Sequence, residues 1–219
     1  MEKNCSIVSV KSDINKEIQR IQLSDGSLFS YKICYLPANF PETLLDPNTA
    51  AESEITSFEE TAFRHASACL RAEKAALKLI ARAEQCRSGL FRKLEKRGHE
   101  AACVSAVINR ICSLQLIDDR RYAQLWLESR LRLPRTPRRL LAALCAKGID
   151  RDDAESSLKE VLDEETEYAL LLRFIKKHER KKSSRNDDTR SLKFLLKGEG
   201  FSIVAIQRYA TFTQEQSEK

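Results

Sequence analysis

Three stretches of the sequence share one pattern: LFRKLEKRG at residues 90–98, LLAALCAKG at 140–148 and LKFLLKGEG at 192–200. Each stretch opens with a leucine, has a second leucine four residues later, and closes with a glycine after four more. Leucines four apart lie on the same face of a helix. A glycine just beyond the last turn readily adopts the left-handed conformation that ends a helix. The pattern therefore predicts three short helices of one kind, repeated about every 50 residues.

The flanking residues predict two more helices in each repeat. DDRRYAQLWLESR (118–130) and DEETEYALLLRFIKK (163–177) precede the second and third short helices and align through a Tyr-Ala pair, while RAEKAALKLIARAEQ (71–85) precedes the first. A further helical segment follows each glycine, with Asp150 or Ser202 placed as N-cap in the second and third repeats. Each repeat is therefore expected to contain three helices.

The first 60 residues have a different character. EIQRIQL (17–23) and SLFSYKICYL (27–36) flank Asp25-Gly26, a strong hairpin signal because glycine accepts the positive φ of a tight turn. Apolar and smaller residues alternate as far as Tyr35, and CSIVSV (5–10) supplies a third candidate strand. Three prolines between residues 37 and 54 predict a linker, or a turn into the helices.

We therefore expect a mainly α-helical fold with a small β-rich N-terminal element. Three tandem three-helix repeats would form an elongated, curved array. The expected divisions are 1–60 for the hairpin element and linker, 61–115, 116–162 and 163–219 for the repeats, with KKSSRNDD as a loop in the third.

Charge is spread unevenly along the chain. Residues 62–150 carry 19 Lys and Arg against 8 Asp and Glu, whereas the whole chain has a formal net charge of +6, so the remaining residues are net acidic. A basic middle is typical of proteins that bind a polyanion or an acidic protein surface. A well-solvated helical surface is the simpler interpretation.

The chain lacks sequence signals for export or membrane insertion. Its first residues do not form a signal peptide, and no apolar run reaches the roughly 18 residues of a membrane span. The seven cysteines include no C-x-x-C pair, which fits reduced thiols. We expect a cytoplasmic protein that does not enter a membrane. It is expected to be monomeric, because no long heptad seam is present.

The adjacent acids Asp118 and Asp119 raise the question of catalysis. They stand where a helix begins, and an acidic group recurs at the same place, residues 163–165, in the next repeat. A carboxylate at this position accepts unpaired helix N–H groups and faces the positive end of the dipole. No His, Ser or Cys is placed beside them as an acid–base partner. Capping is therefore the favoured interpretation, and no catalytic residue is expected.

The sharpest feature is RLRLPRTPRRLL at residues 130–141. Pro134 and Pro137 interrupt the helix and create a bend rich in guanidinium groups, which bind phosphates and carboxylates through two parallel hydrogen bonds. The arginines concerned are Arg130, Arg132, Arg135, Arg138 and Arg139. A weaker basic run, KKHERKK (176–182), extends the possible surface. Trp126 lies one turn earlier and is expected to be a core residue.

Two His/Cys pairs have the spacing of metal ligands. His65 with Cys69 and His99 with Cys103 are each four residues apart, which places both members on one helical face. The two pairs begin separate elements, and free cysteine is often a small buried hydrophobe. We therefore expect no metal and no cofactor.

Three segments, in order, resemble the RecX family of bacterial recombination regulators. They are ALKLIARAEQCRSGLFRKLEKRG (76–98), LIDDRRYAQLWLESR (116–130) and PRRLLAALCAKGI (137–149), and the likeness extends over residues 68–212. An L-I-D-D-x-x-Y-A motif followed by L-x-x-K-G-I is fairly specific. The chain departs from the family by having Thr136-Pro137 where Gly-Pro is common, and by a looser third repeat.

The resemblance implies a helical protein without enzymatic activity. RecX-like proteins bind the RecA recombinase, lodge in the groove of the RecA–DNA filament, and inhibit its ATPase, strand exchange and co-protease functions. It implies a structural signature of Asp118, Asp119 and Tyr122, with Gly148 from the K-G-I motif. It implies contacts from Arg138, Arg139 and Lys147, to which charge alone adds Arg130, Arg132 and Arg135.

Three other functions fit parts of the sequence. A stand-alone helical DNA-binding protein would use the arginine-rich helix start directly, and its affinity would fall steeply with salt. A helical adaptor would use the repeats as a scaffold for an unrelated partner. A metal-dependent enzyme would rest on the His/Cys pairs alone.

Overall fold

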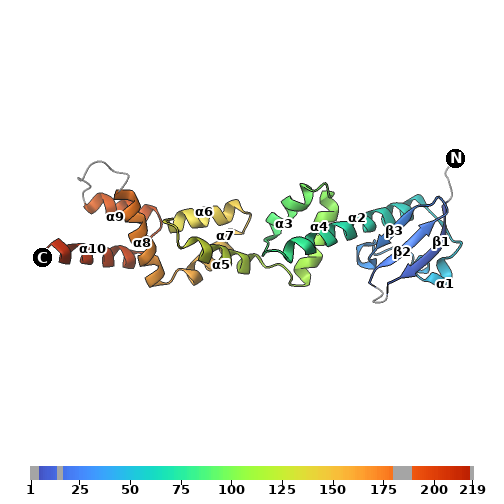
Figure 1. The fold of residues 1–219 in the computed structure, drawn as a ribbon, viewed down its shortest axis with the longest axis horizontal. Coiled ribbons are helices and arrows are strands. Elements are labelled where there is room, and N and C mark those ends of the chain that lie inside the picture. Colours follow the sequence, from blue (N-terminus) through green and yellow to red (C-terminus); the bar gives the residue numbers. More distant parts are fainter. Residues whose placement is uncertain (1–4, 14–16, 180–188, 218–219) are drawn as a thin grey trace. The chain divides into compact units, whose positions relative to one another are not determined.

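The computed structural model describes residues 5–13, 17–179 and 189–217 and confirms the mainly helical fold with a small N-terminal sheet (Figure 1). The described chain separates into two compact units. The first holds the described residues up to 84 together with 89–117, and the second holds 85–88 and the described residues from 118 onward. Each unit has its own cluster of buried hydrophobic side chains.

The N-terminal sheet contains the predicted hairpin. Its strands are β1 (Cys5–Ser12), β2 (Gln19–Leu23), β3 (Leu28–Tyr31) and β4 (Glu54–Ile55), in the order β3-β2-β1-β4. All neighbours are antiparallel. Gly26 has φ of +87°, and the Asp25 carboxylate accepts the Ser27 N–H at 2.8 Å. This confirms the turn predicted from Asp25-Gly26.

Two expectations about this region were wrong. The third strand ends at Tyr31 and not at Tyr35, because Ile33–Tyr35 forms a 3-10 turn, η1, that turns Tyr35 into the core. The supposed linker also contains regular structure: η2 (Glu42–Leu44), the short helix α1 (Pro47–Ala50) and β4. A two-residue strand has no periodicity, so β4 is recognised only by its pairing with Cys5 and Ser6.

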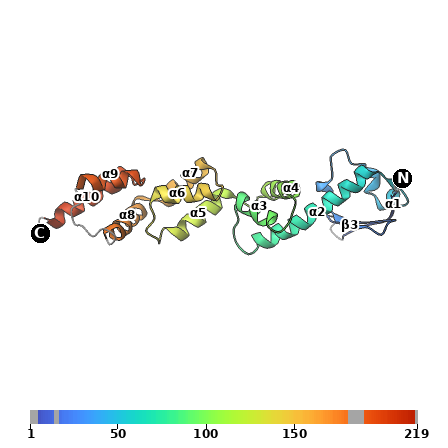
Figure 2. The same ribbon diagram turned by 90° about the horizontal axis from the view of Figure 1, so that it is seen from above.

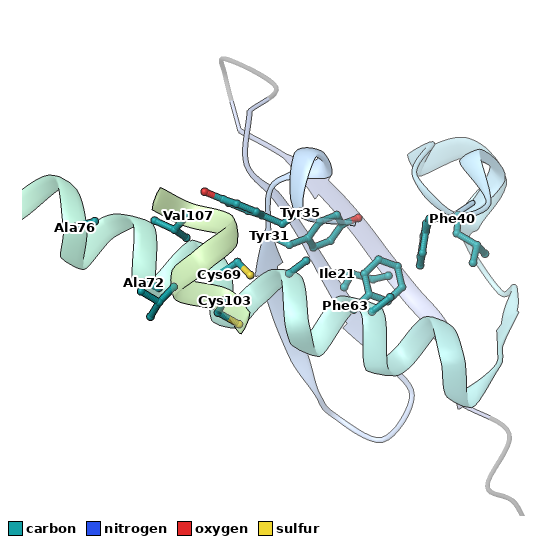
Figure 3. Packing of buried hydrophobic residues seen from close by; sticks show 14 of the residues in the cluster. Ile21, Tyr31, Tyr35, Phe40, Phe63, Cys69, Ala72, Ala76, Cys103 and Val107 are labelled. Atoms are coloured by element: carbon teal, nitrogen blue, oxygen red, sulfur yellow. The ribbon is translucent and has the colours of Figure 1, made fainter. Parts of the chain in front are cut away.

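Helix α2 (Ser57–Ile80) packs along one face of this sheet (Figure 2). It begins with a capping box in which the side chains of Thr56 and Glu59 each accept the other residue's backbone N–H. Figure 3 shows the fully buried Phe63 on α2, with ring centroids 5.0 Å from Tyr31 and 4.9 Å from Phe40. Aromatic packing therefore fixes the helix to the sheet.

Helices α3 (Arg87–Glu95) and α4 (Ala101–Ser113) follow α2. A buried carboxylate of α2, Glu73, links α4 to the N-terminal element. One of its oxygens is 3.1 Å from the Lys32 ammonium and 3.5 Å from the Arg110 guanidinium. This ion-pair network joins the segment after β3 to α2 and α4 and was not predicted.

The remaining helices continue the pattern of three helices per repeat. They are α5 (Asp119–Arg130), α6 (Pro137–Ala146), α7 (Arg151–Val161), α8 (Glu164–Glu179), α9 (Thr189–Gly198) and α10 (Ile203–Ser217). The expected loop at 181–188 and the end of the basic run at 180–182 lie outside the described residues. The repeat boundaries themselves stay a prediction.

The glycines that close the short helices behave as predicted. Gly98, Gly148 and Gly200 have φ of +82°, +86° and +88°. In each case the next residue's N–H returns to the carbonyl of the second leucine, as in the Ile149 N–H bond to Leu144. The leucine thus packs in the core and also accepts the bond that ends the helix. No helix in the described ranges is long and apolar enough to cross a membrane.

Candidate binding surface around the arginine-rich bend

The two acids at the start of α5 have different structural roles. Asp118 is the N-cap, and its carboxylate accepts the N–H groups of Arg120 at 2.8 Å and Arg121 at 3.2 Å. The Asp119 carboxylate accepts the backbone N–H of Arg87 at 2.8 Å, so it fixes the first turn of α3 to the start of α5. Burial raises the pKa of Asp119, and the hydrogen bond from Arg87 opposes that rise. The predicted cap is confirmed for Asp118, while Asp119 makes a long-range contact.

Two of the predicted cationic residues, Arg130 and Lys147, lie against the ring of Trp126. The guanidinium carbon of Arg130 is 5.6 Å from the centroid of the Trp126 ring, and the ammonium of Lys147 is 5.5 Å from it. Such contacts are attractive because the face of the indole ring is electron-rich. Trp126 is half-buried beside the core, as is Tyr122. Trp126 is therefore both a packing residue and the support for a cationic patch.

The bend itself is built by two prolines and a buried threonine. Residues 131–136 leave the helix, and Pro137 occupies the first turn of α6, where its missing N–H costs nothing. Thr136 is the N-cap and is fully buried. Arg132 is exposed and Arg135 is half-buried. Arg132 also lines a shallow, open depression together with Leu131, Glu165, Thr166, Ala169 and Arg173.

Arg138 and Arg139 contact the C-terminal end of α9. The Arg138 guanidinium donates to the carbonyl of Gly198 at 3.2 Å, and its backbone N–H donates to the carbonyl of Glu199 at 3.0 Å. The Arg139 Nε lies 3.6 Å from a carboxylate oxygen of Glu199, which also accepts the Thr136 hydroxyl at 2.6 Å. Both arginines are exposed on the surface. Their contacts with Gly198 and Glu199 nevertheless hold the start of α6 against the end of α9, and we call this contact the α6–α9 joint.

The same kind of joint occurs at the start of α3. Its first turn meets the C-terminal end of α6, where Gly148 packs against Ser88 and the Cys86 thiol is 3.8 Å from the carbonyl of Lys147. The start of α6 meets the end of α9 in the same way, with Gly200 against Pro137 and Arg138. The positive N-terminal end of α6 thus faces the negative C-terminal end of α9.

The structure sorts the predicted contact residues into three groups. Arg130 and Lys147 share Trp126, Arg132 and Arg135 lie on the bend, and Arg138 and Arg139 reach α9. Sequence reasoning missed Glu199, which has no local pattern, and Arg173, whose guanidinium donates to the Leu131 carbonyl at 2.8 Å and caps the end of α5. The spacing of Trp126 and Arg130, four residues apart on one helix, was the available signal for the ring contact. This surface is suited to holding anionic groups.

Comparison with known proteins identifies relatives of this chain. A family model described as "RecX, second three-helix domain" matches residues 118–158, which include α5, the bend and α6. A protein of Treponema pallidum named regulatory protein RecX is 35% identical over 114 residues, which cover 52% of this chain and 70% of the relative. A protein of the same name from Thermus thermophilus is 35% identical over 144 residues, which cover 65% of this chain and 92% of the relative.

A solved structure shares the fold. It is a crystal structure described as regulatory protein RecX, with a TM-score of 0.63 and 18% sequence identity. The likeness covers 93% of this chain and 97% of the other. It extends beyond the segment matched by the family model and supports the helical-repeat fold.

Proposed function

The chain belongs to the RecX family of regulatory proteins, and we propose on this premise that it binds RecA within the RecA–DNA filament and inhibits it. The inhibition extends to ATP hydrolysis, strand exchange and co-protease activity. The protein acts without catalysing a reaction itself, as a monomer in the cytoplasm. Family membership is the observation that carries this proposal.

The surface around the bend supports an assignment of the contact residues. It lies within the segment matched by the family model and gathers cations on a half-buried ring. Arg130, Lys147 and Trp126 would form a fixed centre, because the ring limits the freedom of both cations and lowers the entropic cost of binding. Arg132 and Arg135 would meet RecA carboxylates or DNA phosphates at the edge. Such charges speed association and fix register more than they add affinity.

Arg138 and Arg139 fit the proposal in a second role. Their contacts with Gly198 and Glu199 hold the start of α6 against the end of α9. They would therefore orient two repeats for binding as well as offering charge to RecA or DNA. The second repeat would bridge adjacent RecA subunits.

The first test is RecA ATP hydrolysis on single-stranded DNA with this protein titrated in below one copy per RecA. We expect the rate of ATP hydrolysis to fall even when much less than one copy of this protein is present per RecA. Such an effect is expected of a protein that acts along a polymer. The charge-reversed variant Arg132→Glu/Arg135→Glu should need at least about tenfold more protein for half-inhibition, because it repels the anionic surface. Lys159→Ala, an exposed cation on α7, is the matched control and should inhibit like the parent protein. Equal inhibition by the charge-reversed variant would remove the bend from the interface.

A further comparison separates direct contact from positioning. Arg138→Ala/Arg139→Ala should weaken inhibition under either role. Glu199→Ala removes the carboxylate joint but leaves both arginines in place. Inhibition that survives in Glu199→Ala assigns the arginines to direct contact, and loss in both variants assigns them to holding α6 against α9.

Stand-alone DNA binding is the competing function. It predicts that RecA hydrolysis is unaffected, while binding to bare DNA is strong and falls with salt at a log–log slope of about −0.9 per neutralised phosphate. A mobility-shift titration with and without RecA distinguishes the two. A filament regulator should gain affinity when RecA is present.

A further inference from the structure

A cluster of metal-ligating side chains lies in the first unit. His65 and Cys69 are one turn apart on α2, and Cys103 is in the first turn of α4. One ligand atom from each of the three lies within 4.8 Å of the others. Figure 3 shows Cys69 and Cys103 facing each other from the two helices. The fold thus brings the predicted pair His65 and Cys69 together with Cys103, one member of the second predicted pair.

The three side chains are close enough together for a tetrahedral metal site after a local adjustment. The Cys69 Sγ is 3.5 Å from Nε2 of His65, and the Cys103 Sγ is 3.6 Å from Nδ1 of the same ring. Zinc binds sulfur at about 2.3 Å and nitrogen at about 2.0 Å, which places neighbouring ligand atoms roughly 3.5–3.8 Å apart. The two sulfurs lie beside different nitrogens, and an imidazole offers only one nitrogen to a metal. Binding therefore requires the His65 ring to move until one nitrogen and both sulfurs face the same point.

The environment disfavours bare thiolates and tolerates a metal. Cys69 and Cys103 are 0% and 1% exposed. A divalent ion that replaces the two thiol protons leaves the buried site neutral overall, because two thiolates balance its charge. Burial therefore opposes an uncompensated thiolate but not the complete site.

We propose that His65, Cys69 and Cys103 bind one thiophilic metal ion, zinc(II) in the first instance. Binding forms two metal–sulfur bonds and one metal–nitrogen bond and releases two protons to solvent. His65 is only half-buried, which leaves the fourth position open to a water molecule. The ion would join α2 to α4 and stabilise the first unit. The proposal does not depend on RecA binding.

A disulfide is the other chemistry available to two neighbouring cysteines. Its formation needs an exposed thiolate and an oxidant. Both thiols are buried, and their side chains are 0% and 1% exposed. The observations therefore favour the metal.

The test uses the full chain, stripped with a chelator and kept reduced. Cobalt(II) is titrated first as a spectroscopic probe, and zinc(II) is then added to displace it. We expect a thiolate-to-cobalt charge-transfer band that saturates at one equivalent and disappears with zinc. Zinc should also raise the melting temperature of the stripped protein. Elemental analysis of the zinc-loaded protein gives the stoichiometry.

Three variants assign the ligands. Cys103→Ser and His65→Gln should lose the charge-transfer band or bind at least about tenfold more weakly, whereas Cys145→Ser, at an exposed cysteine on α6, should bind normally. Circular dichroism checks that each variant folds. The proposal is overturned if the parent protein shows no thiolate band, if Cys103→Ser binds equally well, or if thiol counting shows a Cys69–Cys103 disulfide in freshly purified protein.

Discussion

Three glycines have nearly the same backbone conformation but different surroundings. A Cβ added to Gly98 would meet nothing within 4 Å, whereas a Cβ on Gly148 would lie 2.5 Å from the Ser88 Cβ. A Cβ on Gly200 would lie 3.2 Å from the backbone nitrogen of Arg138. Gly98 is thus required by its positive φ alone. The other two also allow one short helix to approach the next.

Alanine substitutions at these positions should separate the cost of a positive φ from the cost of losing a close approach between neighbouring segments. Gly98→Ala should lower the free energy of unfolding by about 1 kcal/mol, the cost of a left-handed side chain. Gly148→Ala should cost about 3 kcal/mol, because overpacking against Ser88 adds to it. Ser88→Gly in the Gly148→Ala background should recover most of the difference. Urea unfolding measures all three, and equal losses for the two alanine variants would contradict the close-approach role.

Tyr31 should make stability depend on alkaline pH. It is fully buried, its hydroxyl donates to Gln19 at 2.8 Å, and burial raises its pKa above the ordinary value of 10.0. The folded state therefore keeps a proton that the unfolded chain releases. Stability from this group is complete below pH 10.0 and is lost as pH rises toward the folded pKa.

Tyr31→Phe should reduce that alkaline loss. At neutral pH the variant should be less stable by about 1–3 kcal/mol, because a buried Gln19 oxygen loses its donor. Above pH 10.0 its stability should fall less steeply with pH than that of the parent protein. Burial also raises the pKa of Tyr35, so the slope should shrink and not vanish. Denaturant unfolding across the alkaline range checks this, and an unchanged slope would assign the dependence elsewhere.

At the scale of elements, the start of α6 is held against the end of α9. Thr136 and Arg138 make the contacts there, with Glu199 and Gly198. Residues 85–88, which belong to the second unit, contact the end of α6 in a similar way through Ser88 and Gly148. A capping residue can therefore have two roles. Thr136 caps the start of α6, and its hydroxyl also bonds to Glu199 at the end of α9. This joint lies within the region proposed to bind RecA.

A double-mutant cycle should measure the α6–α9 joint. Thr136→Val removes both the cap acceptor for the Arg139 N–H and the hydroxyl that bonds to Glu199. We expect Thr136→Val and Glu199→Ala each to cost about 1–2 kcal/mol and to be non-additive by about 1 kcal/mol. Thr136→Ser, which keeps the hydroxyl, should lose little. Additive effects would show that the two residues act separately.

At the scale of the whole molecule, the described chain has two cores. The first packs sheet, α2 and α4 around Phe63, and the second gathers the apolar faces of the later helices around Leu140 and Leu170. The buried Glu73 network belongs to the first core only. Each unit is therefore expected to have its own free energy of unfolding.

Glu73→Ala should affect one unit selectively. It leaves Lys32 with Glu17 alone, at 3.4 Å, and removes the carboxylate beside the partly exposed Arg110. The cost should therefore be about 1–3 kcal/mol, below that of a fully broken buried ion pair. Amide hydrogen exchange followed by mass spectrometry should show faster exchange in β2, α2 and α4, and unchanged exchange in α6 and α7. Glu155→Ala, at an exposed ion pair in the second unit, is the control and should change little. Faster exchange in both units would mean that the chain unfolds as one.

The sequence by itself determined the local parts of this protein. Leucine spacing, glycine ends and N-cap residues act within one or two helical turns, so they predicted the short helices, the caps at Asp118 and Asp150, and the Asp25-Gly26 turn. The family resemblance was also carried by such local motifs. Periodicity alone overextended β3 and passed over the two-residue strand β4.

Only the tertiary structure decided which distant groups meet. Asp119 contacts Arg87, Glu199 contacts Thr136, and Cys103 contacts His65, and each pair is more than 30 residues apart in the chain. These contacts depend on how helices pack, and packing is set by the shape and apolar area of whole faces, which impose no fixed spacing on polar partners. The arginine-rich bend was visible as charge. Its division into residues that contact Trp126, residues on the bend and residues that contact the end of α9 depends on the neighbours that the fold provides.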